Sequence, residues 1–234
     1  MSRSKKTRTK SIDESPPRHI RRLRQIRMEV ASEAARIIAT EGQHNYHAAK
    51  KKAAERVGVS ERLTLPSNIE VQEALQVYQE LYGGIAHSEN LEALRLLALE
   101  AMQQFAQYNP RLVGAVLDGT ASEHSRIALH VFSDSIESVI LQFLQNSISF
   151  SQEQRQIRWY DGTHRTVPLI VYELDGAAVE LTVFEQIYLR QAPPSPIDGK
   201  PQHRATLTDL ECLLAEVADS PLMVHCSNPA GSTG

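Results

Sequence analysis

Hydrophobic positions repeat at helical spacing in the first half of this chain and at strand spacing later. Apolar residues three and four positions apart predict amphipathic helices over residues 19–40, 45–57, 67–82 and 89–108. Gly42, Gly58 and Gly83 follow the first three, as glycine often does after a helix. Ser67 and Glu70 have the spacing of a capping box. The sequence therefore predicts a helical N-terminal region.

Later apolar runs have the length and composition of strands. The predicted strands are residues 127–132, 154–160, 166–174 and 178–184, with a helix over 134–146. Asp161-Gly162 and Asp175-Gly176 between apolar runs predict two hairpins. Thr208 and Glu211 predict the cap of a last short helix. The expected fold class is α+β: an N-terminal helical region, then a minimal mixed sheet with helices packed on one side.

Composition shifts divide the chain into four predicted regions. Residues 1–17 are polar, charged and end in prolines, which predicts a disordered basic arm. A helical domain over 18–85, a sheet-containing domain over 86–218 and a flexible tail over 219–234 follow. Prolines 193, 194 and 196 force extended structure within 189–202. That segment either wraps the sheet or forms a lid bringing Arg190, Gln191, Ser195 and Lys200 to a phosphate.

The composition is that of an ordinary globular chain of 234 residues, with 41% hydrophobic and 23% charged residues. No apolar run reaches the roughly 20 residues needed to span a bilayer, so we expect no membrane contact. The basic N-terminus has no apolar segment after it, which argues against secretion. Two cysteines, Cys212 and Cys226, suit a reducing compartment. We therefore expect a cytoplasmic protein.

Charge is distributed unevenly along the chain. Residues 1–65 hold 16 Lys and Arg against 7 Asp and Glu (+9), and the remaining residues hold 9 against 21 (−12). A basic first quarter fits nucleic acid, an acidic protein partner or the acidic remainder of the same chain. Lys50, Lys51 and Lys52 are candidates for phosphate contact, although a solvated helix face is the commoner use of such a run.

The stretch 111–132, RLVGAVLDGTASEHSRIALHVF, carries the main chemical signal. Its two apolar runs around a glycine-containing polar turn resemble the polymerase-beta-like nucleotidyltransferase superfamily. Gly114 and Gly119 match the glycines of that turn, and Ser125 precedes the strand that holds the metal ions in the superfamily. The resemblance implies a nucleotidyltransferase-like sheet with 127–132 as a central strand, and a nucleotide or phosphorylated ligand in a pocket at this turn.

Three residues depart from the superfamily pattern. Ala115 replaces the phosphate-binding serine, and Arg126 and Ala128 replace the two aspartates. Residues 126, 128 and 130 share one strand face, which then offers a cation, a methyl group and an imidazole. Magnesium requires hard oxygen ligands, so this is a poor metal site and ordinary metal-dependent nucleotidyl transfer is not expected. Neither a catalytic residue nor a cofactor follows from the sequence.

Glu180 is the candidate for a third carboxylate of the site. It either points into the site or outward from a half-exposed strand, and the outward position is favoured because burying an unpaired carboxylate is costly. An ion pair between Arg126 and Glu180 is the structural alternative.

The chain also resembles a family of uncharacterised proteobacterial nucleotidyltransferase-like proteins over residues 29–215. The matching segments include EAARIIATEGQHNYHAAKKKAAERVGV, LPSNIEVQEALQVYQELY, VLDGTASEHSRIALHVFSD and LRQAPPSPIDGKP. That family shows HS-x-x-x-LH in place of paired aspartates, which implies that the loss is a family trait. The resemblance implies no established activity.

Three functions are consistent with these observations. The first is a nucleotidyltransferase-fold protein that binds a nucleotide or phosphorylated ligand. Its candidate ligand-binding residues are Gly114, Asp118, Gly119, Ser122, His124, Ser125, Arg126, His130 and Glu180. The second is a binding module or pseudoenzyme whose basic N-terminal helices contact nucleic acid or an acidic protein. The third is an interaction protein whose N-terminal helices pair with another subunit.

Overall fold

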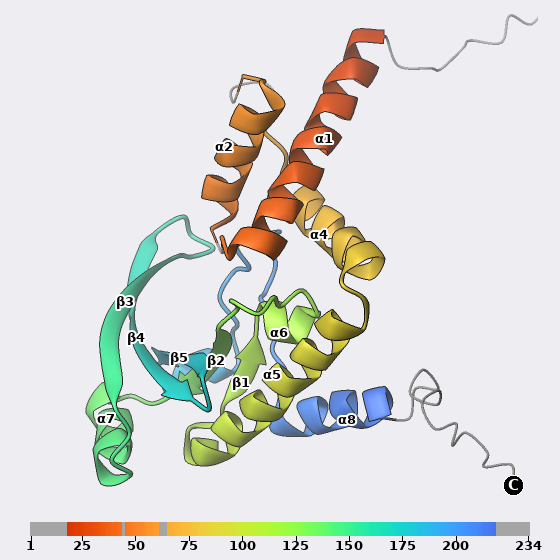
Figure 1. The fold of residues 1–234 in the computed structure, drawn as a ribbon. Helices are drawn as coiled ribbons and strands as arrows, with labels where there is room; N and C mark the ends of the chain where they lie inside the picture. Colours follow the sequence, from red (N-terminus) through yellow and green to blue (C-terminus); the bar gives the residue numbers. More distant parts are fainter. Residues whose placement is uncertain (1–17, 44, 61–64, 219–234) are drawn as a thin grey trace, which may run out of the picture.

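A computed structural model describes residues 18–43, 45–60 and 65–218, so the predicted arm (1–17) and tail (219–234) lie outside the described residues. Its first part is a three-helix unit that stands on one end of the sheet (Figure 1). The unit consists of α1 (Arg18–Glu41), α2 (Tyr46–Val57) and α4 (Asn68–Tyr82). Its buried interior is rich in alanine, including Ala34, Ala49 and Ala53, which lets the helix backbones approach closely.

The predicted helix ends are confirmed where their chemistry is local. The Asn45 side chain accepts hydrogen bonds from the N–H groups of His47 and Ala48, and Gly58 ends α2 in the left-handed conformation. Ser67 and Glu70 form the reciprocal capping box at the start of α4. The next helix, α5 (Gly84–Gln104), begins before the predicted position because Gly83 keeps a helical conformation and joins it directly to α4.

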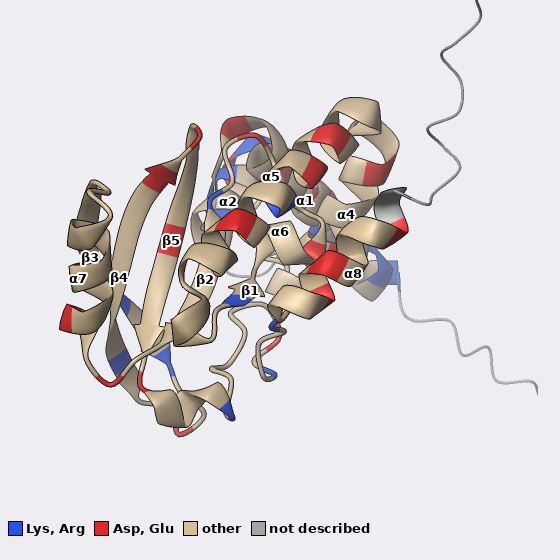
Figure 2. Ribbon diagram, turned by 90° about the horizontal axis from the view of Figure 1, so that it is seen from below, with Lys and Arg blue, Asp and Glu red and all other residues tan. Residues whose placement is uncertain are grey.

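The second part contains a mixed five-stranded sheet, which confirms the α+β fold class. The strands are β1 (Arg111–Val113), β2 (Ile127–Phe132), β3 (Phe150–Arg158), β4 (His164–Leu174) and β5 (Ala177–Phe184). Their order is β1-β2-β5-β4-β3, as Figure 2 shows, and only the β2–β5 pair is parallel. Strand β2 therefore lies inside the sheet, and the two Asp-Gly pairs form the turns at either end of β4.

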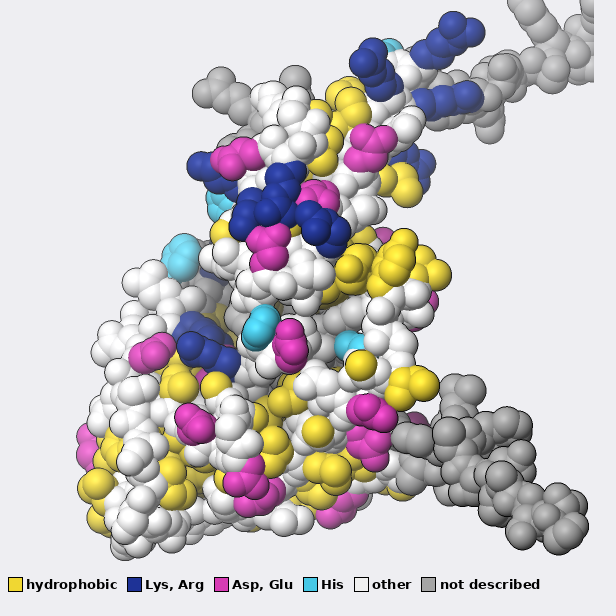
Figure 3. Space-filling model, viewed as in Figure 1, with side chains coloured by type: hydrophobic (Ala, Val, Ile, Leu, Met, Phe, Trp, Pro, Cys, Tyr) yellow, Lys and Arg dark blue, Asp and Glu magenta, His cyan; other side chains and the backbone are white. Residues whose placement is uncertain are grey.

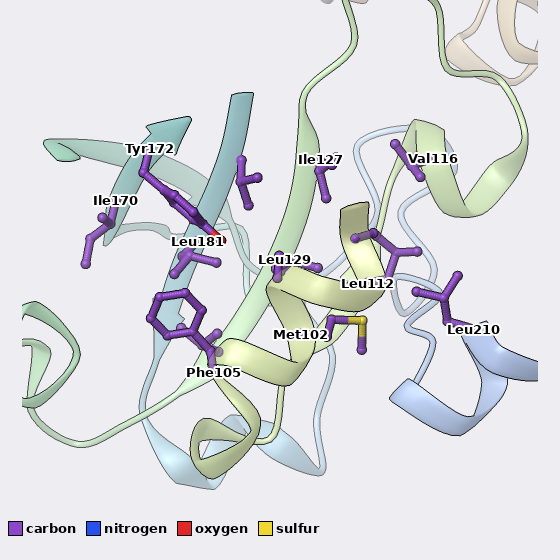
Figure 4. Close-up of a cluster of buried hydrophobic side chains, with 14 of the residues drawn as sticks. Met102, Phe105, Leu112, Val116, Ile127, Leu129, Ile170, Tyr172, Leu181 and Leu210 are labelled. Carbon is purple, nitrogen blue, oxygen red and sulfur yellow. The ribbon is translucent and has the colours of Figure 1, made fainter. Parts of the chain in front are cut away.

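One face of the sheet is covered by helices and holds the main core. Helices α5, α7 (Ile136–Gln145) and α8 (Leu207–Ala218) contribute to this core. Met102 of α5 and Phe105, the residue directly after this helix, meet Leu129 and Leu181 of the central strands, and Leu210 of α8 closes one side (Figure 4). Each of these five side chains is fully buried, and burial of one such side chain stabilises the fold by roughly 1.5–3 kcal/mol.

The start of α8 differs from the prediction. Thr206 and Asp209, and not Thr208 and Glu211, form the capping pair. The Thr206 N–H donates to Asp209 Oδ2 at 2.8 Å, and the Asp209 N–H donates to Thr206 Oγ1 at 3.1 Å. The prediction was wrong because Asp serves as well as Glu at this position, and the β-bridge between Leu112 and Ala205 fixes where the helix starts.

The apolar run 112–117 contains two elements. It is split by Gly114 into β1 and the short helix α6 (Ala115–Asp118). Two short 3-10 helices, η1 (Ala106–Tyr108) and η2 (Gln186–Leu189), complete the described elements. None of the described helices has the length and apolar character needed to cross a membrane.

Candidate functional site

The face of the sheet opposite α5 carries the residues that the sequence identified as departures from the metal-binding pattern. The β2–β5 register pairs Ala128 with Glu180, and the next pair along the two strands is His130 with Thr182. Gly114 lies beside this position, because a Cβ atom built on it is 3.9 Å from the Ala128 Cβ. Ala128, which occupies one expected metal-ligand position, and Glu180, the candidate third carboxylate, are thus neighbours on adjacent strands.

Glu180 is bound by two arginines. Arg155 of β3 donates from Nη1 and Nη2 to the two carboxylate oxygens at 2.8 and 2.9 Å. Arg126 Nη1 lies 3.8 Å from Oε2 of the same carboxylate. The ion pair expected between Arg126 and Glu180 is therefore present, and the favoured outward position of Glu180 was wrong. Glu180 is only 7% exposed, and its two charged partners offset the cost of that burial.

The charges of this Arg126–Arg155–Glu180 cluster do not cancel. Two guanidinium groups, with side chains 45% and 43% exposed, face a single buried carboxylate, so the cluster has a net charge of +1. Both carboxylate oxygens are engaged by Arg155. Arg126 makes no hydrogen bond to Glu180 or to another side chain in the part of the chain that the structure describes. Its donors are available to an anion that approaches from solvent.

His130 is buried beside this cluster. Its ring lies edge-on to Phe184 at 4.7 Å between centroids, and its Nδ1 has no hydrogen-bond partner within the described residues. Burial, together with the nearby charges of Arg204 and Arg155, lowers the pKa of His130 to about 3. A neutral imidazole follows at physiological pH, so His130 offers a lone pair or one N–H and no positive charge.

Arg204, from the segment before α8, adds a further cation to this face. Its guanidinium carbon lies 5.1 Å from the centroid of Phe132 and 5.8 Å from that of Phe184. Nη1 donates to the Tyr188 carbonyl at 2.8 Å, whereas Nε and Nη2 have no partner among residues 18–218 that are described. Burial and the nearby Arg111 lower the pKa of Arg204 to about 10, so the group is still charged near neutral pH.

The turn within residues 111–132 is anchored by side chains of α4 and α5. Gly114 has φ 72° and ψ −153°, a conformation open essentially to glycine alone. Side chains of α4 and α5 bind three backbone carbonyls that follow Gly114 in the chain. Arg95 Nε donates to the Val116 carbonyl and His87 Nε2 to the Gly119 carbonyl. Gln79 Nε2 donates to the Thr120 carbonyl. Gly119 itself, also at positive φ, faces Leu91 and Arg95 of α5 and not the arginine cluster.

The remaining predicted residues do not gather around Glu180. Ser122 and Ser125 bond to each other, with the Ser122 N–H donating to Ser125 Oγ at 2.9 Å. The His124 ring packs against Gly42 at the end of α1, since a Cβ on Gly42 would lie 3.0 Å from His124 Cβ. Asp118 is exposed at the end of α6, and partial desolvation raises the pKa of its carboxyl. His124 therefore connects this loop to the end of α1.

The four residues of the predicted lid lie at two separate places in the proline-rich segment. Arg190 and Gln191 line a shallow depression of about 310 Å³ together with Tyr160, Ala192 and Pro201. Ser195 and Lys200 instead close a turn, in which the Ser195 N–H donates to the Lys200 carbonyl at 2.7 Å. The Asn68 side chain donates to the Pro196 carbonyl, so this turn is fastened to the start of α4. The four side chains do not converge on one point.

The lysine run on α2 is largely used within the helical unit. Lys52 Nζ donates to Glu41 at 2.6 Å, and Lys50 Nζ donates to Asn68 Oδ1 at 2.7 Å. These contacts make the lysines poorer phosphate ligands than the sequence indicates.

Sequence reasoning missed Arg155 and Arg204, the residues that complete the cationic face. Arg155 lies within a predicted strand, but the register aligns Glu180 with Val171 and Ser151, so the Arg155 side chain reaches Glu180 diagonally across β4. Arg204 reaches the sheet through the irregular segment after η2, and the proline pattern of that segment does not indicate where residue 204 comes to lie.

A comparison with models of known protein families gives no match, and no curated protein matches this sequence. The three described stretches contain no group of three or more His, Cys, Asp or Glu residues arranged to hold a metal ion.

Proposed function

We propose that this protein binds a nucleotide or another phosphorylated ligand on the arginine-bearing face of its sheet. The observation that carries the proposal is the convergence of Arg126 and Arg155 on the single carboxylate of Glu180, which leaves net positive charge beside the Gly114 turn. Guanidinium groups bind phosphate oxygens through paired, charge-assisted hydrogen bonds. Arg126 supplies the donors that the ligand meets first.

The geometry favours binding in preference to metal-dependent nucleotidyl transfer. At the position where two carboxylates would hold magnesium, this chain has Arg126 and Ala128. Glu180, the remaining acid, is held by Arg155 through both oxygens. A divalent cation at this point would meet the positive charge of Arg126, whereas a phosphate meets a complementary charge.

Arg204 and His130 extend the same chemistry along the sheet. Arg204 has two donors, Nε and Nη2, without a partner among the described residues, and an unpaired buried donor carries a cost that an oxyanion removes. A ligand with more than one phosphate would bind Arg126 through one phosphate and Arg204 through another. We therefore expect di- and triphosphates to bind more tightly than monophosphates.

The test is isothermal titration calorimetry of the full chain with ATP, GTP, CTP, UTP and inorganic pyrophosphate, in magnesium and in EDTA. Binding is expected to persist in EDTA and to weaken with added salt. Arg126→Gln is expected to weaken it about tenfold, because a charge-assisted hydrogen bond contributes roughly 1.5–3 kcal/mol before solvent screening.

Arg158→Gln is the matched control. Arg158 is an exposed arginine on the same strand as Arg155, but the register places it on the opposite face, paired with His164. It should leave binding unchanged. Absence of binding by every nucleotide and by pyrophosphate contradicts the proposal. So does binding that requires magnesium and is equal in the wild type and Arg126→Gln.

A further inference from the structure

The first half of α1 is a basic surface with apolar side chains exposed on it. Residues 18–28 hold five arginines and no acidic residue. Residues 18–25 are all exposed, and this end of α1 projects beyond α2 and α4 (Figure 1). Ile20, Leu23 and Met28 are 45%, 44% and 61% exposed. Ile20 and Leu23 lie three residues apart and continue the stripe that Val30 and Ala34 bury further along the helix.

A second exposed surface on α4 and the first half of α5 has the opposite charge. Residues 66–94 hold five glutamates and no lysine or arginine. Val77, Leu81, Tyr82 and Ile85 are 52%, 70%, 73% and 75% exposed, and hydrophobic side chains gather over this end of α4 in Figure 3.

Helical spacing interleaves the acidic and apolar residues of that surface. On α4, Glu73, Val77, Glu80 and Leu81 share one face, and on α5 Ile85, Glu89, Glu92 and Leu96 do. We call this the acidic α4–α5 surface, and residues 18–28 the basic end of α1. Large apolar side chains exposed together on a monomer mark an interaction site.

We propose that these two surfaces bind each other between two copies of this chain. Each presents exposed aliphatic side chains between charges of one sign, and the signs are opposite. The attraction already operates within one chain, where Arg27 Nη1 lies 3.9 Å from Glu70 Oε1 as α1 crosses α4. Two copies related by a two-fold axis form the contact twice, which gives a closed dimer.

A nucleic acid fits the basic end of α1 less well. Phosphates would pair with Arg18, Arg21 and Arg24, but Ile20, Leu23 and Met28 would stay in water. A nucleic acid also leaves the acidic α4–α5 surface uncovered. A second copy accounts for both surfaces.

The test is the mass of the full chain in solution, measured by sedimentation velocity and by light scattering after gel filtration over a range of concentrations. A dimer that weakens with salt is expected. Arg21→Glu with Arg24→Glu is expected to raise the dimer dissociation constant by about tenfold or more, since the net charge of residues 18–28 falls from +5 to +1 and the attraction to the acidic α4–α5 surface is weakened in both contacts. Glu80→Arg with Glu89→Arg is expected to do the same.

Mixing the two double variants gives the decisive measurement. In the mixed pair, the glutamates introduced on α1 meet the arginines introduced on the α4–α5 surface, and the unchanged surfaces meet in the other contact, so a heterodimer should form. The pair Arg158→Glu with Lys200→Glu alters charge equally at exposed sites elsewhere and should remain dimeric. Leu81→Ser with Ile85→Ser tests the apolar component and should give a monomer. All the altered side chains are exposed, so folding is preserved.

A wild-type chain that stays monomeric at every concentration overturns the proposal. A dimer that both charge-reversed variants keep also overturns it, as does a mixture of them that forms no heterodimer. Gel-shift assays with RNA and DNA complete the test. A monomer whose nucleic-acid binding is lost in Arg21→Glu with Arg24→Glu assigns the basic end of α1 to nucleic acid instead.

Discussion

Arg155 reaches across β4 to Glu180 and donates one hydrogen bond to each of its carboxylate oxygens, at 2.8 and 2.9 Å. The two residues belong to β3 and β5, which are separated by one strand. The pair therefore ties the edge strand of the sheet to its centre on the face that lacks the α5 helix.

Loss of Arg155 should destabilise the fold more than loss of Arg126. Arg155→Ala leaves the buried Glu180 carboxylate with only the looser Arg126 contact at 3.8 Å, and we expect a loss of about 1–2 kcal/mol in the free energy of unfolding. Arg126→Ala keeps the bidentate pair and should cost less than about 0.5 kcal/mol. Urea denaturation at neutral pH measures both, and equal losses would contradict this assignment.

Glu180→Gln should strengthen phosphate binding. The substitution removes the negative charge that competes for Arg155 and keeps a side chain of the same shape. We expect pyrophosphate to bind several-fold more tightly than to the wild type, as measured by calorimetry. The double variant Glu180→Gln with Arg126→Gln provides the control, and the gain should be lost in it. Weaker binding by Glu180→Gln alone would show that the carboxylate itself contacts the ligand.

Gly114 should be less replaceable than Gly119. Neither position is crowded, since the nearest atoms to an added Cβ are 3.9 and 3.8 Å away. Gly119 has the left-handed φ 77° and ψ 12°, so Gly119→Ala should cost about 1 kcal/mol. Gly114 has ψ −153°, and Gly114→Ala should cost about 2–3 kcal/mol. Thermal unfolding compares the two, and a smaller loss at Gly114 would contradict the conformational argument.

Stability should fall as the pH is lowered below about 6.5, because of His130. Its pKa is about 3 in the fold and near 6.5 in the unfolded chain, so the unfolded chain binds the extra proton between those values. The contribution of His130 is complete above pH 6.5 and decreases by about 2 kcal/mol at pH 5. His130→Phe removes the proton-binding group and suits the neighbouring Phe184 ring, so its stability should change less over this range in urea titrations at each pH.

Thr206 should be the residue that caps α8. Thr206→Ala removes the oxygen that accepts from the Asp209 N–H and should lower the unfolding free energy by about 1 kcal/mol. Thr208→Ala, two residues away in the exposed first turn, should have little effect. A larger loss in Thr208→Ala would restore the capping pair that sequence spacing alone favours.

Local chemistry predicted much of this fold. The Asn45, Ser67 and Gly58 ends of helices and both Asp-Gly hairpins follow from residues within a few positions of one another. The site was predicted only in part. The contact between Arg126 and Glu180 could be expected once residues 127–132 and 178–184 were taken as neighbouring strands, but the burial of Glu180 depends on Arg155 from a distant strand.

The positions of His124, Ser122 and Ser125 could not be predicted from the sequence. Their proximity in sequence to the Gly114 turn suggested a shared pocket, but the loop turns away toward Gly42, the residue directly after α1. Spacing along the chain carries no information on the direction in which an irregular loop leaves a sheet.

The hydrogen bonds from Gln79, His87 and Arg95 connect α4 and α5 to the backbone of residues 116–120, which follows Gly114. We expect a change in the orientation of these helices to move the Gly114 turn, while Arg155 and Glu180 stay with the strands. The distance between the Gly114 backbone and the side chains of Arg126 and Arg155 should therefore depend on the orientation of α4 and α5. We therefore expect a partner that binds the outer surface of α4 and reorients it to change this distance without altering the strands.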